Sequence, residues 1–396
     1  MLARWPGERS FGALVAPLVL AGGLAALAPR GPSESACESW KPVQSPNPGG
    51  SSRDNFLYGT DALSSRDAWA VGFSFKVAAK RTLVLRWNGT AWQRVASSSP
   101  RAAELYGVAA TAQTNAWAVG DHADGALVLH WNGTAWKRAA SRGSSSLRGV
   151  AALSSRDGWA VGYDHTRTGE KTLVLHWDGT AWDRVASPNP RFSLGAELDG
   201  VAVTSPANAW AVGHYYNGGE GSREGYRTLV LHWDGTAWKI VTSPNARSDE
   251  NDLNSVTATS PTSAWAVGEY YIRGGTAART LILRWDGTAW KRVTSPNPGT
   301  ADNFLRGVAA TSPANAWAVG EYNNVRTPAL LSAHRTLVVH WNGTAWKRVA
   351  SPNPGGPASD ISLEGVAATS PRNAWAVGYS TTHGGAFRAL TLHCDT

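Results

Sequence analysis

Short apolar segments alternate with turn-forming residues along most of the chain. The clearest unit begins at Leu305 with LRGVAATSPANAWAVG, continues through a variable stretch and ends at Pro354 with RTLVVHWNGTAWKRVASPNP. Four strand-like segments lie in it, each bounded by Gly, Pro, Asn, Asp or Ser. We name them a (LxGVAAT), b (AWAVG), c (TLVLHW) and d (AWKRVAS). The pattern predicts a unit of four β-strands.

The unit occurs seven times, with successive strand b tryptophans 42 to 58 residues apart. These are Trp69, Trp117, Trp159, Trp210, Trp265, Trp317 and Trp375. Segments c and d are joined by Asn-Gly or Asp-Gly in six copies, which predicts tight antiparallel hairpins. After d, an SPNP-like element such as 295–298 removes backbone donors and ends the sheet. Repeats of this kind indicate a propeller or a solenoid.

The chain ends distinguish these two architectures. The seventh copy stops after segment c at LTLHCDT, and residues 40–48 (WKPVQSPNP) match the missing segment d. A linear solenoid would instead need polar capping repeats. The sequence therefore predicts an all-β, seven-bladed β-propeller of four antiparallel strands per blade over residues 37–396. Its N-terminal strand completes the last blade and closes the ring.

The two cysteines stand at the junction of this split blade. Cys394 occupies the position of the tryptophan that ends segment c, and Cys37 occupies the glycine of the turn. We expect a disulfide that replaces the missing peptide link, worth roughly 5 to 6 kcal/mol in the chain-entropy model. The alternative is two free buried thiols.

Residues 1–36 differ from the repeats. Arg4 and Arg9 precede an apolar run over 13–28, and small polar residues follow it. This pattern predicts a signal peptide cleaved after Ala28 or Ala36, a secreted protein and no membrane span after cleavage. A membrane anchor is the alternative, but the run is shorter than the roughly 20 residues that a spanning helix needs.

Composition narrows the function classes. Hydrophobic residues make up 42% of the chain and charged residues 17%, which indicates a well-buried globular protein. The net charge of +8 falls to +7 without residues 1–36, and without a one-sided basic patch we expect no nucleic-acid partner. Pairs such as Lys291 and Arg292 recur on the outermost strand, where charge discourages edge-to-edge association, so we expect a monomer. Binding to an anionic polymer is the alternative for this belt.

Regular positions are interpreted as structural. Twenty of the 21 tryptophans lie in the repeats, so we expect them to pack between blades rather than to stack on sugars. The His or Arg before each segment c tryptophan falls in a different blade, too far from its counterparts to share a metal. The sequence predicts no metal site and no cofactor. The NGT triplets at Asn88, Asn132 and Asn342 alternate with DGT and are interpreted as turns.

Loop lengths indicate a functional face. The segment a leucine lies 12 residues before the segment b tryptophan in every copy, and the tryptophans of segments c and d lie 5 residues apart in six copies. The distance between the tryptophans of segments b and c ranges from 14 to 24 residues. The distance from the segment d tryptophan to the next segment b tryptophan, which includes the d–a loop, varies as well, from 23 to 29. Both variable loops lie on one face of the disc, and binding usually resides in variable loops on a rigid scaffold.

Two sets of variable residues are predicted to bind a ligand there. The first follows each segment a leucine, near the central channel: Tyr58, Tyr106, Arg148, Asp199, Asn254, Arg306 and Glu364. The second follows AVG and includes Asp121, His122, His214, Tyr215, Glu269, Tyr270, Glu321 and Tyr322. Such a mixture of aromatic and polar groups suits a glycan or peptide.

Three functions remain open. The first is a non-catalytic extracellular module that recognises a carbohydrate or protein. The second is a glycan-active hydrolase or lyase that uses Asp199 and Glu364 with Arg148 or Arg306. Acid–base chemistry needs two carboxylates at a set separation, which the sequence does not specify. The third is a structural or assembly role.

The repeats resemble those of Trp-rich propellers exported by bacteria, similar to the Kelch, sialidase Asp-box and tectonin-lectin propellers. AWAVG and W(D/N)GTAW, as in 316–320 and 341–346, carry the resemblance over residues 37–396. HWDGTAW at 176–182 lacks the leading Ser and the spacing of an Asp-box, and segment b lacks the paired glycines of Kelch. A sialidase likeness would imply an Arg cluster with a Tyr nucleophile, but no motif here assigns those roles.

Overall fold

The computed structural model describes residues 39–76, 79–139, 145–218, 225–246, 250–272, 275, 277–324, 333–356, 359–381 and 385–395. The predicted signal peptide (1–36) and Cys37 lie outside these residues, so the export signal and the disulfide stay predictions. The chain divides into two units, Met1–Glu34 and Ser35–Thr396, and the second contains all described residues. No helix in the described ranges is long and apolar enough to cross a membrane.

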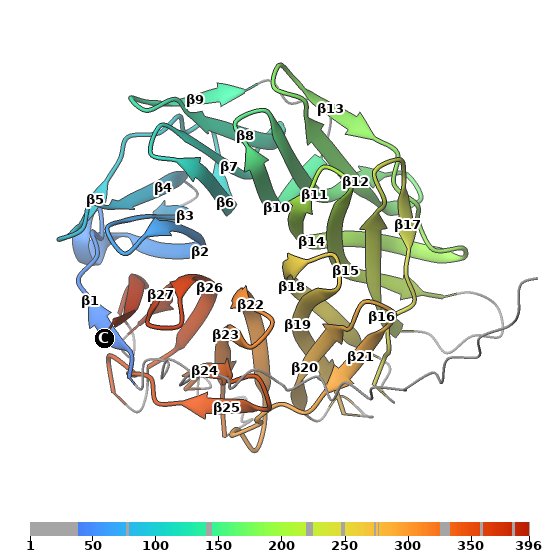
Figure 1. Ribbon diagram of the computed structural model, residues 1–396. Helices are drawn as coiled ribbons and strands as arrows, with labels where there is room; N and C mark the ends of the chain where they lie inside the picture. The colour runs from blue at the N-terminus through green and yellow to red at the C-terminus, as the bar shows by residue number, and fades with distance from the viewer. Residues whose placement is uncertain are drawn as a thin grey trace, which may run out of the picture. The chain divides into compact units, whose positions relative to one another are not determined.

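The unit Ser35–Thr396 is a seven-bladed β-propeller, as the sequence predicts. Its described residues form seven antiparallel four-stranded sheets arranged in a ring (Figure 1). A short 3-10 helix, η1 (Gly50–Ser52), precedes the first complete blade. In each complete blade the strands run a to d from the channel outward.

The strands of the first three blades have the following bounds. Blade 1 contains β2 (Asp54–Ser64), β3 (Asp67–Lys76), β4 (Ala79–Trp87) and β5 (Trp92–Arg94). Blade 2 contains β6 (Glu104–Ala112), β7 (Asn115–His122), β8 (Gly125–Trp131) and β9 (Trp136–Ala139). Blade 3 contains β10 (Ser145–Ser154), β11 (Asp157–Thr166), β12 (Gly169–Trp177) and β13 (Trp182–Val185).

The next three blades repeat this order. Blade 4 contains β14 (Ser193–Ser205), β15 (Asn208–Asn217), β16 (Gly225–Trp233) and β17 (Trp238–Ile240). Blade 5 contains β18 (Asn251–Ser260), β19 (Ser263–Tyr271), β20 (Ala278–Trp285) and β21 (Trp290–Val293). Blade 6 contains β22 (Asn303–Ser312), β23 (Asn315–Tyr322), β24 (Arg335–Trp341) and β25 (Trp346–Val349).

Blade 7 is assembled from both ends of the chain. It contains β26 (Ile361–Ser370), β27 (Asn373–Ser380), β28 (Arg388–Asp395) and the N-terminal strand β1 (Lys41–Val43). β1 pairs antiparallel with β28, with Lys41 opposite His393. Figure 1 shows β1 beside the C-terminal end of the chain. β26 packs beside β2 of blade 1. The ring is therefore closed by the strand that the sequence comparison assigned to this blade.

Tryptophans fill each interface between blades. The strand b tryptophan of one blade meets the strand d tryptophan of the next edge to face, as Trp117 meets Trp182 at 5.1 Å and 89°. Trp40 meets Trp317 in the same way at 5.3 Å and 85°. The strand b tryptophans are at most 2% exposed. Their packing role, predicted from their regularity, is confirmed.

The three tryptophan positions differ in their polar contacts. Each strand c indole donates to a backbone carbonyl in the a–b turn of its own blade, as Trp131 Nε1 does to Gln113 at 3.0 Å. The buried Nε1 atoms of strands b and d have no acceptor among the described residues. Edge-to-face pairing directs a positive ring edge at a negative ring face, which compensates for part of this loss.

The strand c histidines are structural, as predicted. His340 Nε2 lies 2.6 Å from Asn315 Oδ1, and His393 stacks on Trp375 with ring centroids 3.8 Å apart. In blade 1 strand c carries Arg86 in place of the histidine. Its Nε and Nη2 donate to the two carboxylate oxygens of Asp67, at the start of strand b. Burial lowers the pKa of His340 to about 4, so this imidazole is neutral at pH 7.

Candidate functional site

A β-bulge in every innermost strand creates the site. The pairing of strands a and b shifts register after the strand a leucine, as between Leu57 and Gly59, so the residue between them has no partner. The same shift occurs in all seven blades. Because a bulge redirects its side chain, each extra residue faces the channel while the leucine before it is fully buried.

The seven bulge residues line one cavity of about 460 Å³. This volume lies within the range of roughly 300 to 1,000 Å³ that is typical of ligand pockets. The wall also contains the two residues after each bulge position. The structure thus brings together the whole first set of sequence-predicted residues: Tyr58, Tyr106, Arg148, Asp199, Asn254, Arg306 and Glu364.

A second tier lies behind this ring on strand b, fifteen residues after each bulge residue. Asn254 Nδ2 donates to Glu269 Oε2 at 2.7 Å, and Arg148 Nη2 donates to Tyr163 Oη at 2.9 Å. Tyr58 stacks on Phe73 with centroids 5.9 Å apart. These residues orient the ring side chains but do not line the cavity themselves.

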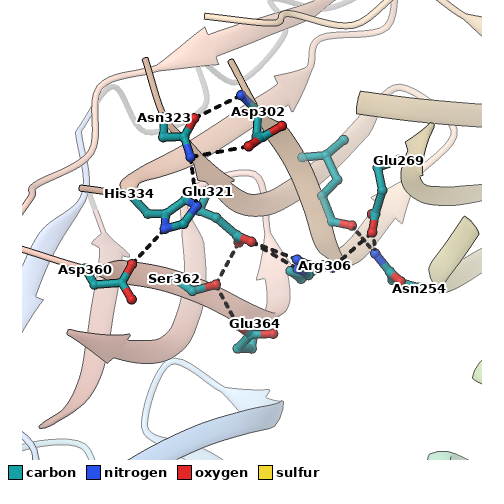
Figure 2. A network of polar contacts seen from close by, with 11 residues as sticks. Asn254, Glu269, Asp302, Arg306, Glu321, Asn323, His334, Asp360, Ser362 and Glu364 are labelled. Atoms are coloured by element: carbon teal, nitrogen blue, oxygen red, sulfur yellow. Dashed lines mark hydrogen bonds and ion pairs between the residues drawn. The ribbon is translucent and has the colours of Figure 1, made fainter. Parts of the chain in front are cut away.

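One arc of the ring is a network of charges centred on Arg306 (Figure 2). The Arg306 guanidinium lies 2.9 Å from Glu321 Oε1 and 3.1 Å from Glu269 Oε1, so two glutamates neutralise it. Burial acts to lower the pKa of Arg306, but the glutamates raise it well above its ordinary value. Burial raises the pKa of Glu269 to about 7, against the opposing effect of Arg306.

Ser362 links two of the carboxyl groups. Its Oγ lies 2.7 Å from Glu321 Oε2 and 2.6 Å from Glu364 Oε1 (Figure 2). A hydroxyl has one proton to donate, so the second short contact requires a proton on a carboxyl group. Burial and the charge of Glu321 raise the pKa of Glu364 to about 7, which makes Glu364 the proton carrier.

A second arc contains a histidine among acids. His214 Nδ1 lies 3.4 Å from Asp199 Oδ2 and 3.7 Å from Asp252 Oδ1. Burial acts to lower the pKa of His214, but the hydrogen bond and charge of Asp199, with Asp252 and Glu197, raise it to about 9. This imidazole is therefore charged at pH 7. His214 and Glu197 also line a smaller hollow of about 210 Å³ with Tyr216 and Tyr226.

The remaining arc is aromatic. Tyr58 and Tyr106 are neighbours, with centroids 5.6 Å apart, and the Arg148 guanidinium lies 4.3 Å from the Tyr106 ring centroid. Behind Tyr58, Phe56 packs against Phe73 at 5.0 Å. The channel mouth thus combines an aromatic wall that carries one arginine with a wall of carboxyl groups.

The second predicted set divides between the two faces of strand b. Asp121, His214, Glu269 and Glu321 belong to the tier behind the ring, where Asp121 accepts from Ser146 Oγ at 2.8 Å. Three of the residues directly after them face the outer strand of their own blade. These are His122, which accepts from Arg138, Tyr322, which accepts from Arg348, and Tyr270, which lies against Arg292. Tyr215 packs against the apolar cluster between blades 3 and 4. Because alternate strand residues point to opposite faces, Tyr215, Tyr270 and Tyr322 point away from the ring, and they lie in three separate apolar clusters between blades.

Sequence reasoning missed one variable position. The residue before each strand a leucine is Phe56, Glu104, Ser146, Glu197, Asp252, Phe304 or Ser362. Ser362 joins two ring acids, and Ser146 donates to Asp121. The signal was present in the variability of this position across the seven copies. Neither predicted set includes this position, because the first set follows the strand a leucine and the second follows AVG.

In the described part of the chain, no three histidine, cysteine or acidic side chains are arranged to hold a metal ion.

Comparisons with known proteins identify the architecture. No family model and no curated protein matches the sequence significantly. Among solved structures, YCF48 bound to a D1 peptide is 14% identical, with a TM-score of 0.53 over 90% of this chain and 97% of that one. An ulvan lyase bound to a glucuronic acid–sulfated rhamnose unit is 10% identical, with a TM-score of 0.55 over 88% and 95%. The WD40 repeats of RRP9 are 9% identical, with a TM-score of 0.55 over 91% and 99%. At these identities the likeness shows the propeller fold alone.

Proposed function

We propose that this chain is an exported recognition propeller that binds a carbohydrate in the mouth of its central channel. The single observation that supports this best is the ring of seven bulge residues, which we call the bulge ring. Seven strands of nearly the same sequence place side chains that differ in type from blade to blade around one cavity. If the channel only completed the fold, we would expect these positions to repeat as the neighbouring leucines and glycines do. Their aromatic and polar side chains match the requirements of a hydroxyl-rich ligand.

Binding to a protein loop is the nearest alternative, and one structural neighbour is a complex with a peptide. We favour a carbohydrate because the tyrosines and hydrogen-bonding groups surround a concave cavity rather than a flat surface. Sugars stack on such aromatic faces and exchange hydrogen bonds with flanking polar groups.

A glycan-active hydrolase or lyase is a second candidate, favoured by one observation. Glu269 and Glu364 have pKa values of about 7, which is suitable for acid–base catalysis near neutral pH. Both groups are engaged by Arg306, Asn254 or Ser362, so binding is the simpler function. Release of reducing or unsaturated ends from a bound glycan would show that the protein is a hydrolase or a lyase.

The first test is glycan-array binding with alanine substitutions of the aromatic wall. We expect Tyr106→Ala and Tyr58→Ala each to weaken glycan binding at least tenfold, by roughly the energy of a lost aromatic stacking contact. Tyr270→Ala is the matched control, because Tyr270 also lies under an arginine but outside the channel. Equal binding by wild type and both channel variants, at unchanged melting temperature, would refute the assignment.

Export is a separate part of the proposal. We expect the mature chain to begin after Ala28 or Ala36 and to be recovered outside the cell. N-terminal sequencing of the secreted protein measures this directly, and an intact residue 1–36 segment on a cytoplasmic product would contradict it.

A further inference from the structure

The bulge ring contains two arginines in different electrostatic environments. Arg306 is bound by Glu269 and Glu321, so its charge is balanced within the protein. Arg148 also lines the cavity, but its contacts are the Tyr163 hydroxyl at 2.9 Å and the Tyr106 ring at 4.3 Å. In the described ranges no carboxylate forms an ion pair with Arg148.

The acids nearest to Arg148 along the fold are bound to other groups. Glu104 pairs with Lys80, and Asp121 accepts from Ser146. Asp164, which follows Tyr163, pairs with Arg184 on the outer strand. Asp199, the bulge residue of the next blade, pairs with His214, and Glu197 of that blade acts on Arg148 through its charge without a hydrogen bond. A guanidinium fixed in a cavity wall in this way lacks the counter-ion that a half-buried charge normally acquires.

We propose that Arg148 binds the anionic group of an acidic sugar, so that the ligand of the proposed recognition site is a carboxylated or sulfated glycan. The guanidinium remains charged at any physiological pH and offers parallel donors that match a carboxylate or sulfate. Tyr106 covers one face of the guanidinium and Tyr163 fixes one nitrogen, which leaves the other donors for a ligand. Tyr58, next to Tyr106, supplies an aromatic surface beside the anion site for the sugar ring.

This inference rests on the proposed function, and it is tested with probes that differ only in charge. Trigalacturonate and its methyl ester have the same ring structure, but only the first carries carboxylates. We expect calorimetry to show the charged trisaccharide binding at least tenfold more tightly, with an advantage that shrinks as salt is raised. A sulfated trisaccharide distinguishes the two anionic groups.

Substitutions assign the difference to Arg148. Arg148→Ala and Arg148→Gln should abolish the preference for the charged probe while retaining binding of the ester. Arg148→Lys should recover part of it, because lysine keeps the charge without the paired donors. Tyr163→Phe should weaken the charged probe alone, since it removes the bond that positions the guanidinium. Arg292→Ala is the matched control, because Arg292 lies 4.4 Å from the Tyr270 ring centroid outside the channel.

The outcomes separate the two proposals. Equal binding of ester and acid, or an unchanged preference in folded Arg148→Gln, overturns the anion site and leaves carbohydrate recognition standing. Binding of neither trisaccharide, with binding of an acidic peptide such as pentaglutamate, overturns carbohydrate recognition in favour of a protein ligand. Melting temperatures of every variant identify any loss that comes from misfolding.

Discussion

At the scale of single residues, the proton between Glu321 and Glu364 is the feature with the clearest consequence. The Ser362 hydroxyl cannot donate to both carboxylates, so the native structure holds a proton that the unfolded chain releases at lower pH. The pKa of Glu364 is raised from 4.5 to about 7. Stability from this group is complete below the unfolded value and is lost as pH rises through the folded value.

We therefore expect the free energy of unfolding to fall between about pH 5 and pH 8, by roughly 1 to 3 kcal/mol from this group. Glu364→Gln, which cannot lose a proton, should flatten the profile, and the part that remains contains the contributions of Glu269 and His214, whose pKa values are also raised. Urea denaturation at a series of pH values measures the effect. An identical slope in wild type and Glu364→Gln would show that the proton lies elsewhere.

At the scale of elements, each blade is attached to the next by its tryptophans. Trp117 of β7 is 1% exposed and contacts both Trp177 and Trp182 of blade 3. Removing an indole from a packed interface leaves a cavity that surrounding strands only partly fill. Seven similar interfaces make the blades interdependent rather than independently stable.

Trp117→Ala should lower the free energy of unfolding by about 3 to 5 kcal/mol, the usual cost of a buried aromatic truncated to alanine. Ile240→Ala serves as the comparison, since Ile240 is 47% exposed on β17 and should cost no more than about 0.5 kcal/mol. Chemical denaturation monitored by circular dichroism gives both values. A loss below about 1 kcal/mol for Trp117→Ala would mean that the interface tolerates the cavity.

The bulge is the element that the sequence analysis did not recognise. In LxGV the leucine and the valine are three residues apart, so a regular strand would place them on opposite faces. Both are buried, as Leu305 and Val308 show, because the bulge adds one residue between them. Sequence variability correctly placed Arg148 and Glu364 at the channel. It grouped Tyr270 and Tyr322 with them because a simple count of residues after AVG ignores which side of strand b each one occupies.

At the scale of the whole molecule, closure depends on a strand of three residues. Lys41, Pro42 and Val43 pair with β28, and Ser45 Oγ adds a hydrogen bond to the Ala389 carbonyl at 3.0 Å. Without this segment, β28 would present an open edge to solvent and Trp317 would lose its partner Trp40.

Deletion of residues 1–48 should therefore abolish cooperative unfolding or produce aggregates that join through the exposed edge. Deletion of residues 1–36 is the control, because it leaves β1 and both cysteines in place and should preserve the transition. Differential scanning calorimetry with size-exclusion chromatography compares the two. A monomeric, cooperatively unfolding product of the longer deletion would show that β1 is dispensable.

The sequence by itself determined the architecture: the number of blades, their strands, the split last blade and the structural role of the tryptophans. These follow from repetition, because a feature present in seven copies reports a requirement of every blade. Only the tertiary structure decided which side chains share a cavity, which carboxyl groups are bound and which arginine lacks a counter-ion. Such relations depend on contacts between side chains of neighbouring blades, which differ from blade to blade, and on a one-residue bulge that changes the face on which a side chain lies.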